Sequence, residues 1–298
     1  MSMRIRLEQF RQARSIHGGL RGWLLASLVV RFSRLPSPWA SVRRKVFGKL
    51  YGGKYPALNE NELEKPLVDF RSINELFARG VRPELRPVCN DPNVIVSPVD
   101  GCVQDIGRLQ DDTVLTVKGL NYVISSLCPE IDIESFRDGH FAILFLSPRD
   151  CHRVFSPADG VLTRMTHVPG HRLLVHPSHQ TADYPVFTLN ERLIMELETS
   201  QGRLLVIMVA GWGVGNITHP FPVTLRISPR RVSVTELSPA RSLQRGDWMA
   251  TFELGSTAIV LTEKDRIHQT VLSRDDVVRY GQALFHTHDG QNAQEAVK

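Results

Sequence analysis

The sequence contains few cysteines, and their positions exclude two common uses. The 298 residues include only Cys89, Cys102, Cys128 and Cys151. These four are too widely spaced for a paired Cys-x-x-Cys metal site and too few for a disulfide framework in a chain of this length. This usage is typical of a reducing compartment, so we expect a cytoplasmic setting.

The sequence also lacks an apolar run long enough to cross a membrane. The apolar stretch Trp23–Val30 has eight residues, whereas a helix needs about 20 to span the hydrocarbon layer. A cleaved signal peptide is disfavoured as well, because the stretch is short, no clear small-residue cleavage site follows it, and further arginines do.

Acidic residues are almost absent from the first 50 positions. This segment has eleven Arg and Lys residues and a single acid, Glu8, whereas the whole chain carries a net charge of +5. Apolar side chains such as Trp23, Phe32 and Trp39 are interleaved with the cations. A basic amphipathic segment of this kind suits the surface of an anionic membrane. A solvated pair of basic helices and a nucleic-acid patch are the alternatives, and we expect no nucleic-acid partner.

The periodicity divides the chain into a helical segment and a β-rich remainder. We expect amphipathic helices over residues 4–33 and 39–51 and a third helix over 72–79. From residue 94, short β-type runs alternate with turn residues, which favours an α+β fold with a β-rich core. We therefore predict a membrane-associating region at 1–69 and a β-rich domain at 70–298. The expected strands are 94–96, 113–117, 141–146, 173–175, 193–197, 204–209, 223–227, 231–235, 249–253 and 257–261.

A short turn sequence occurs twice in the β-rich part. Ser-Pro-Val-Asp-Gly at 97–101 recurs as Ser-Pro-Ala-Asp-Gly at 156–160, and Pro-x-Asp-Gly is a sequence that hairpin turns prefer. Together with the Arg-Gly-Asp turn at 245–247, this repeat resembles the paired hairpins of barrel-sandwich hybrids such as lipoyl carriers. The similarity concerns the fold and does not define a chemistry.

Leu-Gly-Ser-Thr at 254–257 interrupts an apolar strand pattern. A Gly-Ser pair weakens a strand and contributes little packing. Because Gly255 has no Cβ, the Ser256 hydroxyl can approach the carbonyl group that precedes it. Attack there would convert the peptide into an ester, and elimination with loss of ammonia would leave a pyruvoyl group on the new amino terminus. Taken alone, the motif is better explained by a β-bulge.

Four further motifs accompany Leu-Gly-Ser-Thr. Asp100 lies in the first Pro-x-Asp-Gly turn, and Ser-Pro-Arg-Asp-x-His-Arg-Val at 147–154 gathers titratable groups in one loop after an apolar strand, as functional loops do. Val-Pro-Gly at 168–170 and Asn-Glu-Arg at 190–192 follow. In this order and spacing, over roughly residues 70–281, the five motifs resemble the bacterial phosphatidylserine decarboxylases. The basic lead segment is similar to that family too.

The resemblance implies a function and its residues. It implies decarboxylation of phosphatidylserine to phosphatidylethanolamine through a Schiff base on a pyruvoyl cofactor, which Ser256 forms by self-cleavage between Gly255 and Ser256. It assigns Asp100 to the charge relay for self-cleavage and His152 to decarboxylation, where a pKa of roughly 6.5 would suit proton transfer. The two cleaved chains would stay together, peripherally bound to the cytoplasmic face of the cell membrane. Oligomeric state stays open, a homo-oligomer included.

One position departs from the family pattern. The family has a second histidine directly after Arg-Val, acting as the base between aspartate and serine, whereas this chain has Phe155, which cannot accept a proton. The possible substitutes are His140, His167, His171, His176 and His179. The last three have a spacing that also suggests zinc, but a second pair of ligands is lacking, so we expect no metal.

Three other functions remain as alternatives. A non-catalytic lipid-binding relative that has lost self-cleavage would explain Phe155, and intact mass would reveal it as a single chain. A pyruvoyl decarboxylase acting on a soluble amino acid is disfavoured by the basic amphipathic segment. A lipoyl-type carrier is disfavoured because neither Asp100-Gly101 nor Asp159-Gly160 places a lysine in a hairpin turn.

Overall fold

The structure is a computed structural model that describes most of the chain beyond the first 23 residues. It describes residues 24, 28–36, 39–51, 58–110, 114–117, 120–176, 180, 185–211, 217–225, 227–228, 230–253 and 256–288, with only the backbone at 50–51, 114–117 and 256. Most of the expected helix 4–33, His179 and Gly255 therefore lie outside the described residues. Within them, no helix has the length and hydropathy that a membrane-spanning segment requires.

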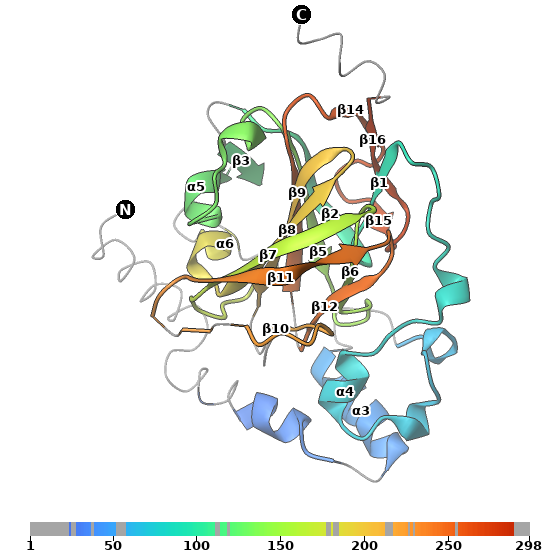
Figure 1. Cartoon of the computed structure of the whole chain (residues 1–298). Coiled ribbons are helices and arrows are strands. Elements are labelled where there is room, and N and C mark those ends of the chain that lie inside the picture. The colour runs from blue at the N-terminus through green and yellow to red at the C-terminus, as the bar shows by residue number, and fades with distance from the viewer. Residues whose placement is uncertain are drawn as a thin grey trace, which may run out of the picture.

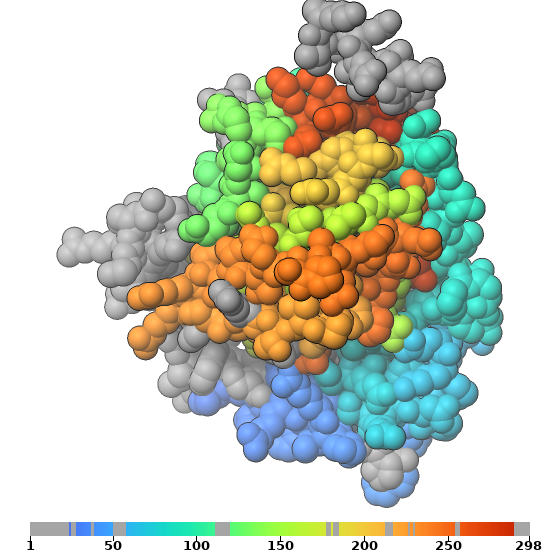
Figure 2. Space-filling view, in the orientation of Figure 1, coloured from blue at the N-terminus to red at the C-terminus, as the bar shows by residue number. Residues whose placement is uncertain are grey.

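Short helices near the amino-terminal end surround a small core of their own. Residues 28–33 are helical, α3 spans Ala40–Tyr51 and α4 spans Ile73–Phe77, which confirms the predicted helices at 39–51 and 72–79. α4 begins where the Ser72 side chain accepts a hydrogen bond from the Glu75 amide, as an N-cap does. We call residues 28–36, 39–51 and 58–86 the helical layer, which Figures 1 and 2 show below the strands. It also contains the 3-10 helices η1 (Glu60–Glu62), η2 (Leu67–Asp69) and η3 (Pro83–Leu85). The buried residues of its hydrophobic core are Phe47, Leu63, Phe70, Leu76 and Phe77.

An eight-stranded antiparallel sheet forms the body of the protein, which confirms an α+β fold rich in strands. In spatial order it consists of β11 (Ser233–Leu243), β7 (Gly160–Val168), β8 (Arg192–Thr199), β9 (Gly202–Ala210), β13 (Ser256–Thr262), β5 (His140–Leu146), β2 (Gly101–Arg108) and β15 (Val277–Val278). Whether the body is a barrel-sandwich hybrid stays a prediction.

Both faces of the central strands are buried. Ala258 and Val260 of β13 contribute to one hydrophobic core, and Ile259 and Leu261 to another, because successive side chains of a strand point to opposite faces. α5 (Ile124–Leu127), α6 (Val186–Leu189) and β4 (Leu120–Val123) supply buried residues to the second core. The described residues also form three smaller sheets. One pairs β3 (Val114–Val117) with β4. A second consists of β1 (Val94–Val96), β16 (Ala283–Thr287) and β14 (Ile267–Thr270), and a third of β10 (Ile217–Thr218), β12 (Trp248–Phe252) and β6 (Arg153–Phe155). A further 3-10 helix, η4, spans Glu134–Phe136.

The two repeated turns bond to each other as a pseudo-symmetric pair. The Val96 amide donates to the Pro157 carbonyl at 2.9 Å, and the Phe155 amide donates to the Pro98 carbonyl at 2.8 Å. Each turn leads directly into a strand, β2 at Gly101 and β7 at Gly160, as the turn sequence predicts. We call residues 97–101 the first turn and residues 156–160 the second turn.

Each turn is closed by the same backbone device. Gly281 donates to the first turn at the Ser97 carbonyl, and Gly246 donates to the second turn at the Ser156 carbonyl. Both glycines have a positive φ, 84° and 85°, which glycine adopts readily because it has no Cβ. The sequence repeat therefore corresponds to a structural repeat.

Two predicted strands are absent. Residues 173–175 are not a strand because a side chain takes the place of a strand partner: the Asn190 amide group accepts from the Leu173 amide and donates to its carbonyl. The described residues of 223–227 are also irregular, and Val223 and Leu225 pack against the core from a loop. Apolar composition alone thus misassigned both segments.

Candidate active site

All five sequence motifs lie at the same end of the eight-stranded sheet. β2 begins at Gly101, β5 ends at Leu146 and β13 begins at Ser256, and these three strands are antiparallel neighbours. On the other side of β13, β8 begins at Arg192, where it pairs with the last residue of β7, Val168. The topology therefore gathers segments that are up to 150 or so positions apart in the chain into one region.

Ser256 is the first residue of a central strand. Its backbone pairs with Leu146 of β5 and with Ala210 of β9, and both ladders continue to Thr262 without a register shift. The bulge that the Gly-Ser pair suggests is therefore absent from Ser256 onward. Neighbouring strands lie about 4.8 Å apart, so the end of β5 is one strand spacing from Ser256.

The loop that follows β5 is held both internally and by the helical layer. The Asp150 carboxylate accepts hydrogen bonds from the Ser147 amide at 2.7 Å and from the Ser147 hydroxyl at 2.6 Å, both at Oδ2. Arg79 of the helical layer donates to the Arg149 carbonyl, and the Cys151 thiol donates to the Arg79 carbonyl at 3.5 Å. Burial raises the pKa of the Asp150 carboxyl, although the hydrogen bonds from Ser147 act in the opposite direction.

Asp100 is buried and fully engaged by other groups. Arg86 donates to both of its carboxylate oxygens, from Nε at 3.0 and 3.1 Å and from Nη2 at 2.7 Å, and the Tyr280 amide donates to Oδ1 at 2.9 Å. Arg86 also donates to Glu62 at 2.8 Å. Burial opposes the charge on Arg86, but Asp100 and Glu62 hold its pKa above the usual value.

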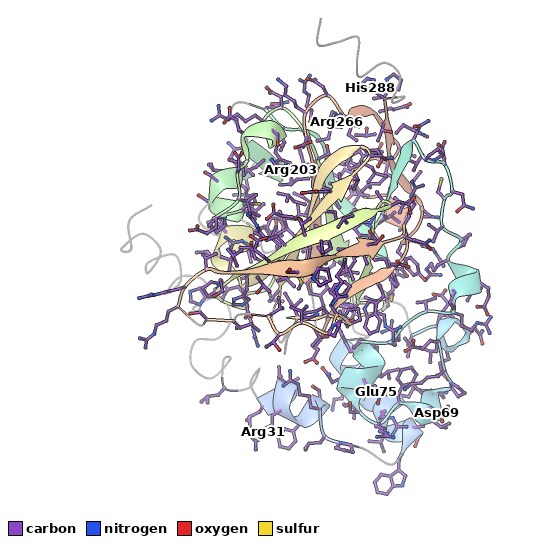
Figure 3. All side chains as sticks on the ribbon, viewed as in Figure 1. Arg31, Asp69, Glu75, Arg203, Arg266 and His288 are labelled. Atoms are coloured by element: carbon purple, nitrogen blue, oxygen red, sulfur yellow. The ribbon has the colours of Figure 1, made fainter. Side chains whose placement is uncertain are left out.

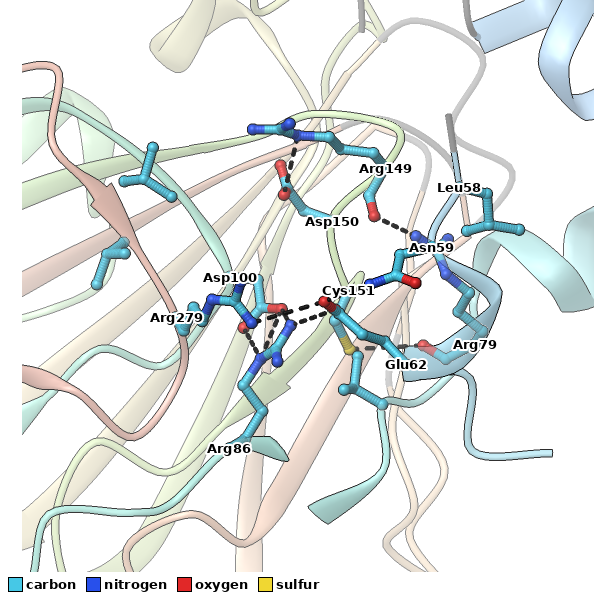
Figure 4. Close-up of a pocket in the computed structure, with 13 residues that line it drawn as sticks. Leu58, Asn59, Glu62, Arg79, Arg86, Asp100, Arg149, Asp150, Cys151 and Arg279 are labelled. Atoms are coloured by element: carbon cyan, nitrogen blue, oxygen red, sulfur yellow. Dashed lines mark hydrogen bonds and ion pairs between the residues drawn. The ribbon is translucent and has the colours of Figure 1, made fainter. Parts of the chain in front are cut away.

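These charged groups line a pocket of about 270 Å³ (Figure 4). Its polar lining comes from the helical layer, the first turn, the loop after β5 and the segment after β15. The charged members are Arg79, Arg86, Arg149, Arg279, Glu62, Asp100 and Asp150. In the part of the chain that the structure describes, no group of three or more His, Cys, Asp and Glu side chains could hold a metal ion.

His152 is completely buried, and its protonation differs from the sequence expectation. Its ring packs against Phe77 of α4 with centroids 4.0 Å apart, and Nδ1 lies 3.0 Å from the Asp150 carbonyl. Burial lowers the pKa of His152 to about 3, because an apolar environment disfavours the charged ring. The expectation that His152 titrates near neutral pH is therefore wrong. A neutral imidazole can still relay a proton, and His152 Nε2 has no hydrogen-bond partner among the described residues.

Phe155, which the motif resemblance places where the family has a second histidine, is also buried. Its ring stacks on Tyr280, with centroids 3.8 Å apart and an angle of 18° between the rings. The Tyr280 amide donates to Asp100, so Phe155 packs on the ring of a residue whose backbone bonds the aspartate. Arg86 supplies the charged hydrogen bonds to Asp100, and Phe155 belongs to an apolar cluster with Val81, Cys151 and Tyr280.

The histidines that could replace this base differ in position. His140 is the first residue of β5 and lies about 20 Å along the strand from Leu146, which pairs with Ser256. It is close to His288, which Figure 3 labels at the end of the molecule opposite Arg31. His140 is therefore excluded. The His167 ring nitrogen Nε2 lies 3.1 Å from the Glu191 carboxylate. The backbone of His171 forms an isolated β-bridge with Asn190, and the His176 ring packs edge-on against Phe145. These three lie at the Ser256 end.

The Asn and Arg side chains of the Asn-Glu-Arg motif donate hydrogen bonds to backbone carbonyls near the site. Sequence analysis did not predict this structural role. Asn190 Nδ2 donates to the Ala210 carbonyl at 2.7 Å as well as to Leu173, and Ala210 is the residue that pairs with Ser256. Arg192 donates to four carbonyls, those of Ser126, Leu127, Thr188 and Asn190. Sequence reasoning also missed Arg79, Arg86 and Glu62. No local pattern identifies them, because their long side chains reach the site from a separate layer.

Comparisons with known proteins support the motif resemblance. The family described as phosphatidylserine decarboxylase matches residues 73–286. The phosphatidylserine decarboxylase proenzyme of Nitrosococcus oceani is 32% identical over 296 residues, which cover 91% of this chain and 94% of that protein. The proenzyme of Dickeya dadantii is 36% identical over 80% of each chain, and one from Escherichia coli is 35% identical over 78% of this chain and 75% of that protein. Motifs and matches define a β-rich decarboxylase that is made as a proenzyme. The chain belongs to the phosphatidylserine decarboxylase family.

Proposed function

We propose that this protein decarboxylates phosphatidylserine to phosphatidylethanolamine with a pyruvoyl group that Ser256 provides after self-cleavage. The main support is the position of Ser256, which begins a central strand at the end of the sheet where the other four motifs meet. The relatives whose names include this activity align over most of the chain. The non-catalytic alternative has only Phe155 in its favour.

The surroundings of Ser256 fit a cofactor made from the chain itself. β13 is paired on both sides from its first residue, so a cut before Ser256 leaves the new terminus fixed between β5 and β9. The two resulting chains would remain associated for the same reason. Once formed, a pyruvoyl carbonyl supplies an electron sink for the pair released when carbon dioxide leaves. His152, whose buried Nε2 has no hydrogen-bond partner among the described residues, would position the proton that replaces the carboxyl group.

We further propose that the helical layer binds an anionic membrane peripherally, on the cytoplasmic face. Leu28, Phe32, Leu35 and Trp39 are all exposed, with Phe32 at 62% and Trp39 at 66%, and Arg31 lies between them. Apolar side chains next to cations favour the interface of an anionic bilayer. Arg34, in the same segment, forms an ion pair with Glu253 at 2.5 Å. The membrane surface would thus lie close to the cleavage site.

Intact mass of the purified chain tests this function. We expect two fragments, residues 1–255 and 256–298, with the smaller one resistant to Edman degradation, and a single inactive chain for Ser256→Ala. An uncut but active wild type, or an active Ser256→Ala variant, would contradict the pyruvoyl assignment. An uncut and inactive wild type would favour the non-catalytic alternative.

The pseudo-symmetric turns provide a matched control for Asp100. Asp159 accepts a hydrogen bond from the Arg245 amide at 2.8 Å, just as Asp100 does from the Tyr280 amide. We expect Asp100→Asn to impair formation of the small fragment and Asp159→Asn to leave it unchanged. Equal effects would show that Asp100 acts only as a turn residue.

A further inference from the structure

The segment between β10 and β11 carries positive charge and no acidic residue. Between Glu198 and Glu236 the sequence contains no Asp or Glu. The arginines in that interval are Arg203, Arg226, Arg230 and Arg231. The structure describes residues 219–225, 227–228 and 230–232, which we call the β10–β11 loop. Arg230 and Arg231 are both exposed there, so the loop presents two adjacent cations to solvent.

Ile227 is an exposed apolar residue next to these cations. Phe221, Val223 and Leu225 alternate along the loop and pack against the hydrophobic core of the body. Ile227 continues this alternation in the sequence, but 58% of it is exposed. A single exposed isoleucine is common on protein surfaces, so the combination with neighbouring arginines is what indicates a binding surface.

The two arginines have a fixed backbone and unpaired charges. The Ser228 hydroxyl accepts hydrogen bonds from the Arg230 amide at 3.4 Å and from the Arg231 amide at 3.2 Å. Elsewhere in the body, exposed arginines pair with carboxylates, as Arg274 does with Asp105 at 2.7 Å. In the part of the chain that the structure describes, no carboxylate forms an ion pair with Arg230 or Arg231. Their guanidinium groups can therefore bind an anionic partner.

Both ends of the loop lie near the helical layer and the Ser256 end of the sheet. At one end, β10 pairs with the last residues of β12, next to Glu253, which Arg34 of the helical layer binds. At the other end, β11 begins opposite His167, which also lies at the Ser256 end. Figures 1 and 2 show the segment around β10 directly above the helical layer. The loop therefore lies on the side of the molecule where the exposed apolar residues of the helical layer are.

We propose that the β10–β11 loop is a second membrane contact, in which Ile227 enters the interface of an anionic bilayer and Arg230 and Arg231 bind lipid phosphate groups. An apolar side chain beside unpaired cations suits that interface. The inference rests on the proposed function, because it assumes a bilayer at the helical layer, and it adds a contact that belongs to the β-rich body.

A contact on the body has a consequence that the helical layer alone does not provide. One attached segment leaves the body free to pivot above the bilayer. Two separate contacts fix the orientation of the body and hold the Ser256 end towards the lipids. The loop should therefore affect turnover of phosphatidylserine in bilayers and leave turnover in detergent micelles unchanged.

Sedimentation of the full-length protein with vesicles tests the contact. The vesicles consist of phosphatidylcholine with or without phosphatidylglycerol. The double variant Arg230→Gln/Arg231→Gln should bind the phosphatidylglycerol vesicles about 10-fold more weakly at low salt, because it loses two cations near an anionic surface. The difference should shrink as salt is raised. Ile227→Ser should also weaken binding, with little dependence on salt.

The matched control removes two arginines from the opposite end of the molecule. Arg108 is exposed at the end of β2, and Arg266 is labelled in Figure 3 at the end opposite Arg31. Arg108→Gln/Arg266→Gln makes the same change in net charge and should bind the vesicles like wild type. Equal weakening by both double variants would show that only net charge matters, and would overturn the proposal.

Hydrogen exchange provides a readout that needs no variant. Phosphatidylglycerol vesicles should protect peptides covering residues 219–232 of wild type and leave those covering 264–270 unchanged. The proposal is overturned if wild type binds these vesicles while the loop stays unprotected and Arg230→Gln/Arg231→Gln binds as tightly. Protection of the loop by a short RNA and not by vesicles would overturn it in favour of a nucleic-acid contact.

Failure of the proposed function gives different results. If wild type does not bind phosphatidylglycerol vesicles, the membrane part of that function is wrong and this inference is wrong with it. If wild type binds them through the loop but stays uncut and inactive, the catalytic part alone is contradicted and the membrane contact is supported.

Discussion

The first and second turns have the same backbone geometry but different surroundings. Each turn aspartate accepts from the amide that precedes a positive-φ glycine, at 2.9 Å for Asp100 and 2.8 Å for Asp159. The Asp100 side chain is 5% exposed and bound by the Arg86 guanidinium, whereas the Asp159 side chain is 70% exposed and lies 4.0 Å from Nη2 of the Arg245 guanidinium. The Pro-x-Asp-Gly turn alone therefore does not produce a buried, charged pocket around its aspartate.

The difference between the turns comes from the helical layer. Arg86 and Glu62 belong to that layer and reach only the first turn. The helical layer buries Asp100 and makes it part of a charged pocket. A charge removed from water is stable only if an opposite charge or hydrogen-bond donor compensates it. The four predictions below test this comparison.

The largest difference in stability is expected when the arginine beside each turn, Arg86 or Arg245, is replaced by methionine. Arg86→Met leaves Asp100 buried without its cation, which typically costs about 3–5 kcal/mol. Arg245→Met removes hydrogen bonds to the Cys89 and Asp91 carbonyls, a loss of about 1–2 kcal/mol. Urea unfolding of both variants measures the difference, and equal losses would show that the buried ion pair stabilises the fold no more than the two Arg245 hydrogen bonds do.

Acidification should lower the free energy of unfolding through His152, whose ring is covered by Phe77 of the helical layer. His152 has a folded pKa of about 3 against an ordinary value of 6.5, so the unfolded chain binds its proton first. The stabilising contribution is complete above pH 6.5 and is lost as pH falls towards 3. Between pH 7 and pH 5 the free energy of unfolding should fall by about 2 kcal/mol from this residue. His152→Phe should lack that part of the decrease, and an identical pH profile would refute the burial of a neutral ring.

The two glycines should respond alike, because they close the turns in the same way. An alanine at Gly246 or Gly281 must adopt a positive φ, at a cost of about 1–2 kcal/mol. Its Cβ would lie 2.9 Å from the Val88 side chain at Gly246 and 3.0 Å from the Val88 Cα at Gly281. Thermal unfolding should place both variants within about 1 kcal/mol of each other. A large difference would break the pseudo-symmetry.

The smallest effect is expected at the exposed aspartate. Asp159→Asn keeps an acceptor for the Arg245 amide and changes only an exposed charge, so the free energy of unfolding should shift by less than about 0.5 kcal/mol. Chemical denaturation is sensitive enough to check this. A loss comparable to that of Asp100→Asn would mean that the charge itself stabilises both turns.

The central strands and the repeated turns were predictable from sequence because their signals are local. β5, β9 and β13 are continuous apolar runs, as strands buried on both faces are. β2 and β7 contain polar residues such as Gln104 and Arg164, and periodicity did not reveal them. The mutual hydrogen bonds of the turns involve residues far apart in sequence, which no local pattern encodes.

The candidate site was predictable only in part, for a related reason. The motifs indicated Asp100, His152 and Ser256, and the sheet topology places all three at one end. The partners of these residues depend on tertiary packing: Arg86 binds Asp100, and Phe77 covers His152. The low pKa of His152 follows from that cover and could not be inferred from the residue type.

The central place of β13 also governs how the mature protein can refold. The precursor carries every strand on one chain, so completing the main sheet requires no association between separate fragments. After a cut before Ser256, the small chain holds the middle strand of the main sheet together with β14, β15 and β16. Neither chain can then complete the sheet alone, and recovery from denaturant becomes a second-order association that fails on dilution. Maturation would convert a protein that refolds by itself into one that must be assembled once and kept folded.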